Sequence, residues 1–148
     1  MYHGPIPRST FEGSGFFAKI HEAVKNNKPV HLVPLSPNFE AVDSIVYHPK
    51  DPNLICILDT MNPKHPISVS DLHEIQEWLQ LHALSAKLRS KKLKQWRFVF
   101  IIPQHMASTF KLQRFDNDIP EDAWARKVNQ CMLGVEGGIF VFDLADSN

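Results

Sequence analysis

The sequence predicts a mixed α/β fold with helices on both faces of one β-sheet. Three observations lead to this class: apolar segments that alternate or run continuously as strands do, two amphipathic segments with helical spacing, and an overall order of helix, three strands, helix, strand, helix, strand. The chain has 148 residues, 43% of them hydrophobic, which suits one domain spanning residues 1–148. Residues 1–12 are expected to be an irregular N-terminal segment.

The first half of the chain predicts a short helix followed by three strands. Residues 13–27 form the helix, because their apolar side chains recur at helical spacing at Phe16, Phe17, Ile20 and Val24. Residues 29–35 are a brief extended segment. Residues 39–47 alternate as a strand that places Asp43 on the same face as Ile45, and the turn rich in Pro, Asp and Asn leads to a central apolar strand over 53–61.

The second half predicts two helices, two strands and a weak helical segment. The stronger helix starts at Ser68 or Ser70, and its apolar residues continue at helical spacing as far as Ala86. Residues 96–103 are a second central strand, and residues 105–115 allow a short helix. Residues 118–134 predict a terminal helix with an acidic first turn, and residues 139–144 predict the last strand.

Charge and composition exclude several function classes. Sixteen basic and sixteen acidic residues cancel, so a polyanion would be drawn only by a local patch. Cys56 and Cys131 lie in apolar runs without metal-ligand spacing, which favours buried thiols in a reducing compartment. No apolar run reaches the length of a membrane helix, no signal peptide opens the chain, and no Gly-rich loop predicts a nucleotide cofactor, so we expect an intracellular protein, in cytoplasm or nucleus, without membrane contact.

Four segments of the chain resemble a nuclease-like domain. They are FEAVDSIVY at 39–47, ILDTMNPKHPIS at 57–68, WRFVFIIP with HMASTFKLQRF at 96–115, and AWARKVNQCMLGV at 123–135. Together they are similar to the PD-(D/E)xK domain of Crinkler proteins and of retrotransposon-hot-spot families in fungi, oomycetes and trypanosomatids. The resemblance implies a restriction-endonuclease-like core, helix-βββ-helix-β, followed by a terminal helix. It also implies an effector of a plant-associated fungus or oomycete that is secreted and then acts inside host cells.

The resemblance implies a metal-dependent site in which the sequence departs from the family pattern. Such nucleases hold Mg²⁺ with an aspartate from one strand and an acidic or amide residue from the next, followed two positions on by Lys or Thr. Asp43 and Thr60 match, and the His-Pro-Ile motif is present at 65–67, but Leu58 stands at the acidic position. Asp59 points to the opposite side of that strand from Leu58 and Thr60, so it replaces the missing carboxylate only if a bulge re-aims it.

The candidate catalytic residues are therefore Asp43, Thr60 and Lys64, with Asp43 and Asp59 as metal ligands and Mg²⁺ as a cofactor only if the domain is catalytic. Lys64 is included because its loop follows the strand. Each residue also has an ordinary structural role: Asp43 as a hydrogen-bond acceptor, Asp59 as a loop cap, and Thr60 as a β-strand former.

A basic run at residues 87–94 is the candidate phosphate-contact patch. In the functional interpretation, this run and the nearby Arg97 bind nucleic acid. The residues concerned are Lys87, Arg89, Lys91, Lys92, Lys94 and Arg97. In the structural interpretation, the run is the solvated C-terminus of a helix, where the helix dipole favours positive charge.

Two functions follow from the sequence. One is a catalytically inactive, nuclease-derived domain that binds nucleic acid or a host protein. The other is a Mg²⁺-dependent nuclease with an atypical site centred on Asp43. Leu58, the absence of Lys at position 60 and the zero net charge favour the inactive domain.

Overall fold

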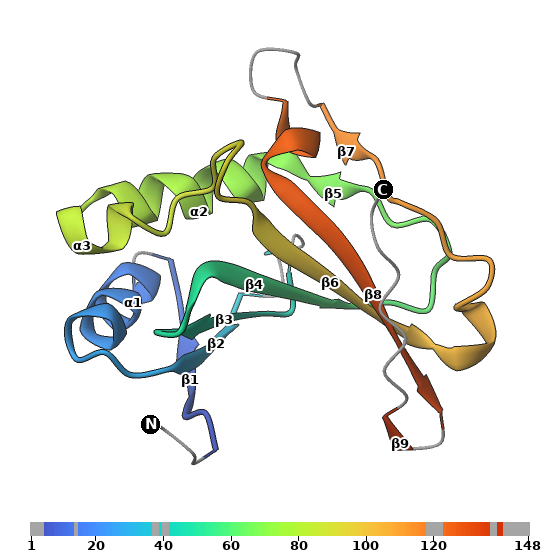
Figure 1. Ribbon diagram of the computed structural model, residues 1–148, viewed down its shortest axis with the longest axis horizontal. Coiled ribbons are helices and arrows are strands. Elements are labelled where there is room, and N and C mark those ends of the chain that lie inside the picture. The colour runs from blue at the N-terminus through green and yellow to red at the C-terminus, as the bar shows by residue number, and fades with distance from the viewer. Residues whose placement is uncertain are drawn as a thin grey trace.

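A seven-stranded mixed sheet organises the part of the chain that the structure describes. The structure is a computed structural model, and it describes residues 5–13, 15–36, 39, 42–117, 123–136 and 139–140. The sheet has the order β1-β2-β3-β4-β6-β8-β9 (Figure 1). Its strands are β1 (Arg8–Phe11), β2 (Val30–Pro34), β3 (Ser44–His48), β4 (Asp51–Asp59), β6 (Trp96–Pro103), β8 (Val128–Glu136) and β9 (Ile139–Phe140).

The remaining elements are helices and one small second sheet. The α-helices are α1 (Gly15–Lys25), α2 (Val69–Gln80) and α3 (Ala83–Ala86). Two short 3₁₀ helices are η1 (Gln104–Met106) and η2 (Trp124–Arg126). The strands β5 (Ile67–Ser68) and β7 (Phe115–Asp116) pair in parallel away from the main sheet.

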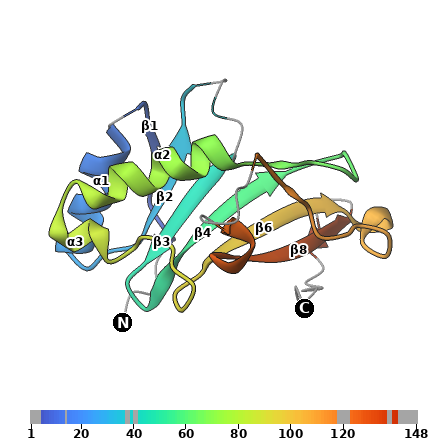
Figure 2. The same cartoon turned by 90° about the horizontal axis from the view of Figure 1, so that it is seen from above.

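Strand directions explain why the described helices lie on one face of the sheet. The pairs β1 with β2, β4 with β6, and β6 with β8 are parallel, and each step runs the same way across the sheet. Connections between parallel strands are almost always right-handed, so three connections stepping in one direction leave on the same face. The predicted placement of helices on both faces is therefore wrong for the described residues; Figure 2 shows α1, α2 and α3 grouped together.

The covered face holds the hydrophobic core. A row across the sheet aligns Leu32, Ile45, Cys56, Phe98 and Gln130, and all five side chains are buried. Over the β1 end, the ring of Phe16 in α1 lies 5.4 Å from that of Trp78 in α2. Over the β6 end, the Phe100 and Phe110 rings lie 5.3 Å apart. The helices and the segment after β6 thus share one buried layer.

The opposite face of the sheet carries half-buried aliphatic side chains. They alternate with the core positions along each strand, as a pleated strand requires. Among them are Val46, Ile55, Ile57, Val99, Ile101 and Leu133. No helix of the described residues lies over them, so this apolar face follows directly from the one-sided connections.

Most of the predicted elements are confirmed, and the others differ; of the short helix expected over 105–115, only the 3₁₀ turn η1 at its start is present. The predicted helices at 13–27 and 68–86 are present, although the second breaks after Gln80 and restarts as α3, where His82 Nδ1 accepts the Leu84 backbone N–H at 3.2 Å. Within the segment expected to be irregular, residues 8–11 are strand β1. The predicted terminal helix is wrong over 128–134, which belongs to β8.

Other predictions are resolved only in part. The acidic first turn at 118–122 and most of the last predicted strand, beyond Phe140, lie outside the described residues. No disulfide joins Cys56 and Cys131. Cys56 lies on β4 and Cys131 on β8, and β6 lies between these strands. Neighbouring strands are about 4.8 Å apart, so the Cα atoms of the two cysteines are farther apart than a disulfide allows. No helix within the described ranges is long and apolar enough to cross a membrane.

Candidate functional site

Three of the predicted site residues, Asp43, Asp59 and Thr60, lie at the edge of the sheet where its parallel strands end. In open α/β sheets, ligands bind outside the carboxyl ends of such strands. Here β4 ends at Asp59 and β6 at Pro103, and a cavity of about 620 Å³ opens between them. Thr60, Ile101 and Val135 help to line it.

Asp43 and Asp59 come together at this edge through a backbone hydrogen bond. The carboxylate Oδ2 of Asp43 accepts the N–H of Asp59 at 2.6 Å, and the Asp43 N–H donates to the carbonyl of Ile57 at 2.7 Å. Asp43 lies in a bend before β3 and is exposed, so the prediction that it sits inside a strand is wrong. Its exposure removes the need for a buried counter-charge, and its hydrogen bond ties the start of β3 to the end of β4.

The closeness of the two carboxylates affects the ionisation of Asp59. Partial burial, and secondly the negative charge of Asp43, raise the pKa of Asp59 above its ordinary value. The negative charge of Asp43 therefore makes ionisation of Asp59 less favourable. Such a pair attracts cations, but attraction alone does not make a metal site.

The two residues at the motif positions face the core instead. Leu58 is 4% exposed and Thr60 is 8% exposed, whereas Asp59 between them is exposed. Leu58 aligns with the buried Phe100, and Asp59 aligns with Ile101 on the other face. The Thr60 hydroxyl is occupied locally, since its Oγ1 accepts the Asn62 N–H at 3.0 Å. The alternation predicted from sequence is thus confirmed.

These residues do not fit the Mg²⁺ site that the resemblance implies. Mg²⁺ takes octahedral oxygen ligands, and the motif would supply two of them from side chains on one face. Here one oxygen of Asp43 already accepts a backbone N–H, and Leu58 supplies no oxygen. Within the described part of the chain, no three His, Cys, Asp or Glu side chains are grouped to hold a metal ion.

Lys64 does not belong to the Asp43 edge. Its backbone N–H donates to Oδ1 of Asn62 at 3.0 Å, which holds its loop in a turn. Its exposed side chain lines a different cavity, together with Lys111 and Arg114. The prediction that Lys64 acts in a site with Asp43 therefore has no support in this arrangement.

The basic run forms a tight turn with a smaller cation cluster than predicted. Lys91 and Lys94 exchange two backbone hydrogen bonds of 3.0 Å, and Leu93 at the tip is 98% exposed. Burial, and then the charges of Lys91 and Lys87, lower the pKa of Lys94. The Lys94 Nζ also donates to the Lys87 carbonyl, and Lys91 pairs with Lys94 through the backbone, so these three lysines form one local cluster. Lys92 is exposed on the same turn.

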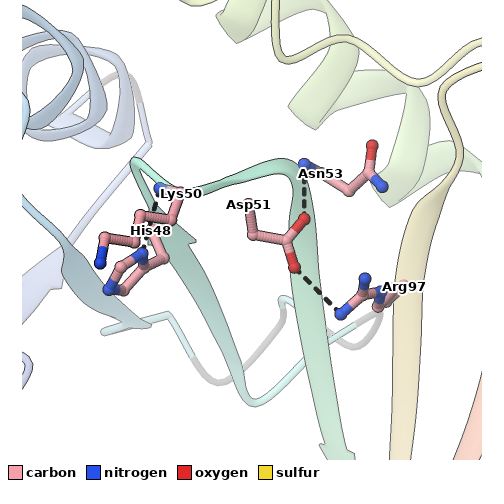
Figure 3. Close-up of polar contacts among 5 residues, drawn as sticks. All are labelled: His48, Lys50, Asp51, Asn53 and Arg97. Carbon is pink, nitrogen blue, oxygen red and sulfur yellow. Dashed lines mark hydrogen bonds and ion pairs between the residues drawn. The ribbon is translucent and has the colours of Figure 1, made fainter.

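Arg89 and Arg97 have different surroundings from these lysines. The Arg89 Nε is buried and lacks a hydrogen-bond partner in the structure. Arg97 lies on the uncovered face, where its guanidinium forms a 3.0 Å ion pair with Asp51 (Figure 3). Asp51 also accepts the Asn53 N–H at 3.1 Å, within the turn that joins β3 and β4. Of the six predicted residues, Arg97 is therefore already paired with an acidic side chain.

Sequence reasoning missed a pair of glutamines that joins three segments near the site. Gln113 and Gln130 are buried, and Gln130 bonds both the N–H and the carbonyl of Gln113 at 2.8 Å. The Gln113 side chain in turn bonds the backbone of Pro63, His65 and Lys111. Two polar residues 17 positions apart give no sequence signal for such a contact.

None of the family models, curated proteins and solved structures compared with this chain matches it.

Proposed function

We propose that this protein is a nuclease-derived interaction domain that does not hydrolyse phosphodiesters. The observation that carries the proposal is the division of residues 58–60 between two faces: Leu58 and Thr60 point into the core, while Asp59 points away from it. Metal-dependent hydrolysis needs a carboxylate and the water-orienting residue on one face, directed at the same phosphate. Here that face of the strand is apolar and covered.

The derivation from a nuclease rests on the arrangement of the core. Helix α1, the antiparallel strands β2, β3 and β4, helix α2 and the parallel strand β6 follow one another in the order that the PD-(D/E)xK resemblance implies. Asp43 precedes the second of these strands, and Asp59 ends the third. The one-sided helices and β8, in place of a terminal helix, depart from the implied pattern.

The binding role rests on features that catalysis does not need. The three clustered lysines Lys87, Lys91 and Lys94 offer phosphate contacts, and the uncovered sheet face offers apolar contacts. The proposed partners are accordingly nucleic acid or a host protein. The resemblance extends the proposal to an effector that acts inside host cells.

The second candidate function is a Mg²⁺-dependent nuclease centred on Asp43. The apposition of Asp43 and Asp59 favours it, because two neighbouring carboxylates at a strand edge are the start of a metal site.

Nuclease assays separate the two functions. The protein and its Asp43→Ala variant, purified identically, are incubated with plasmid, single-stranded DNA and RNA in Mg²⁺ or Mn²⁺. The proposal expects equal and negligible cleavage by both proteins. Metal-dependent cleavage that disappears in Asp43→Ala would reject it in favour of the nuclease.

A further inference from the structure

In a second cavity, separate from the Asp43 edge, the charged residues among the described lining are all cations. It has a volume of about 650 Å³ and lies between the loop that follows β4 and the segment that follows η1. Lys64 comes from the first segment, and Lys111 and Arg114 come from the second. No carboxylate is among the described residues that line the cavity, so within that lining nothing offsets the positive charges of these three residues.

The backbone that carries these cations is fixed from several sides. The Gln113 Oε1 accepts the His65 N–H at 2.5 Å, and its Nε2 donates to the carbonyls of Pro63 and Lys111 at 3.2 and 2.7 Å. The Ile67 N–H donates to the Arg114 carbonyl at 2.9 Å, where β5 begins to pair with β7 (Figure 1). The backbone of both lining segments is therefore held in place without a ligand, which lowers the entropic cost of binding.

The chemistry of the lining selects the ligand class. Arginine binds phosphate through two parallel N–H donors, and lysine binds it as a point charge. Cations on both walls match a ligand with several adjacent negative charges better than a single monoanion. The described lining contains no aromatic ring, so it lacks the stacking platform that single-stranded nucleic acid uses.

We propose that this cavity is a binding site for a small ligand that carries adjacent phosphate groups. Lys64 binds from one wall, and Lys111 and Arg114 bind from the other. The Gln113 side chain holds the two walls at a fixed separation. This site is independent of the nuclease derivation, because it uses neither Asp43 nor the lysines of the 87–94 turn.

Calorimetric titration with inorganic triphosphate at low ionic strength tests the proposal. Binding is expected, with orthophosphate weaker, and Lys64→Gln, Lys111→Gln and Arg114→Gln should each weaken it by about tenfold. Lys28→Gln is the matched control, since it removes the same charge from an exposed site outside both the cavity lining and the 87–94 turn and should leave the affinity unchanged. All four side chains are exposed, so melting temperatures should agree and confirm folding.

Three results would overturn the proposal. The first is the absence of binding at millimolar triphosphate. The second is an equal loss in Lys28→Gln and in the cavity variants, which would indicate general charge attraction. The third is tighter binding of a single-stranded oligonucleotide that the same three cavity variants abolish, which would assign the cavity to nucleic acid.

Discussion

The carboxylate of Asp43 accepts the backbone N–H of Asp59 at 2.6 Å, so an acidic residue positioned like a metal ligand fastens one strand to the next. The same contact places a second carboxylate nearby and raises its pKa. One residue pair thus combines a structural hydrogen bond with electrostatic repulsion, and the balance between them can be measured.

Neutralising Asp43 should lower the pKa of Asp59. In Asp43→Asn the amide oxygen still accepts the N–H of Asp59, but the charge that contributes to the raised pKa is gone. The pKa of Asp59 should fall yet stay above its ordinary value of 3.8, because burial is the larger cause. Carboxyl chemical shifts followed against pH report it directly, with Asp51→Asn as the control. An unchanged value in Asp43→Asn would contradict the assigned repulsion.

Removing the charge of Asp59 should stabilise the protein at neutral pH. A carboxyl whose pKa is raised in the folded state costs folding free energy above that pKa, and this cost vanishes as pH falls below the unfolded value of 3.8. Because Asp59 is solvent-exposed and screened, Asp59→Asn should increase the free energy of unfolding by only about 0.5 kcal/mol at pH ~7. Urea denaturation across pH measures it. A stabilisation by Asp59→Asn that increases as the pH falls would contradict this prediction.

Shortening Gln113 should be strongly destabilising. Gln113→Ala leaves the His65 N–H and the carbonyls of Pro63 and Lys111 without their side-chain partner, at a cost of about 2–4 kcal/mol. The matched control is Gln95→Ala, which removes one exposed hydrogen bond to Arg126 and should cost about 0.5 kcal/mol. Equal effects of the two changes in chemical denaturation would refute the role of Gln113 in joining the two loops.

Gly134 is constrained by the side chain of Gln104. A Cβ at position 134 would lie 2.2 Å from the Gln104 Oε1, an atom that is buried and lacks a hydrogen-bond partner in the structure. Gly134→Ala forces this flexible side chain to move, so it should cost about 1 kcal/mol or less, and the cost should vanish when Gln104→Ala is already present. A double-mutant cycle gives this coupling, and additive effects would show that Gln104 is not the obstacle.

The two cysteines should differ in reactivity. Burial raises the pKa of the Cys56 thiol to about 12, whereas Cys131 lies half-buried on the uncovered side of β8. At mildly alkaline pH, iodoacetamide should modify Cys131 in the folded protein and Cys56 only after unfolding. Cys131→Ser should therefore show no modification when folded. Rapid labelling of that variant under native conditions would contradict the burial of Cys56.

The order of the core elements could be predicted from the sequence because their hydrophobic periods are strong. The central strands β4 and β6 are nearly continuous apolar runs, and α1 and α2 carry clear amphipathic stripes. A helix was predicted where strand β8 lies, because the core position at Gln130 is polar. The residue that forms its hydrogen bonds, Gln113, belongs to another segment. The hydrophobic periodicity of a sequence indicates a buried position only where the side chain at that position is apolar.

The candidate site could be predicted only in its local geometry. The opposite directions of Leu58 and Asp59 follow from the two-residue period of a strand. The exposure of Asp43 depends on where β3 begins, and the grouping of Lys64 with Lys111 and Arg114 depends on a parallel β5–β7 pair. Such long-range contacts are set by tertiary packing, which no short pattern encodes.

Binding of Mn²⁺ at the Asp43 edge tests the central claim most directly, because the proposed loss of catalysis rests on an incomplete metal site. Paramagnetic broadening of the backbone amide signals of residues 57–61 is followed during Mn²⁺ titration of the protein and of Asp43→Asn. The account predicts weak broadening, reached only at millimolar Mn²⁺ and without saturation at lower concentrations. Saturable broadening at micromolar Mn²⁺ that Asp43→Asn abolishes would contradict it and restore the metal-dependent nuclease.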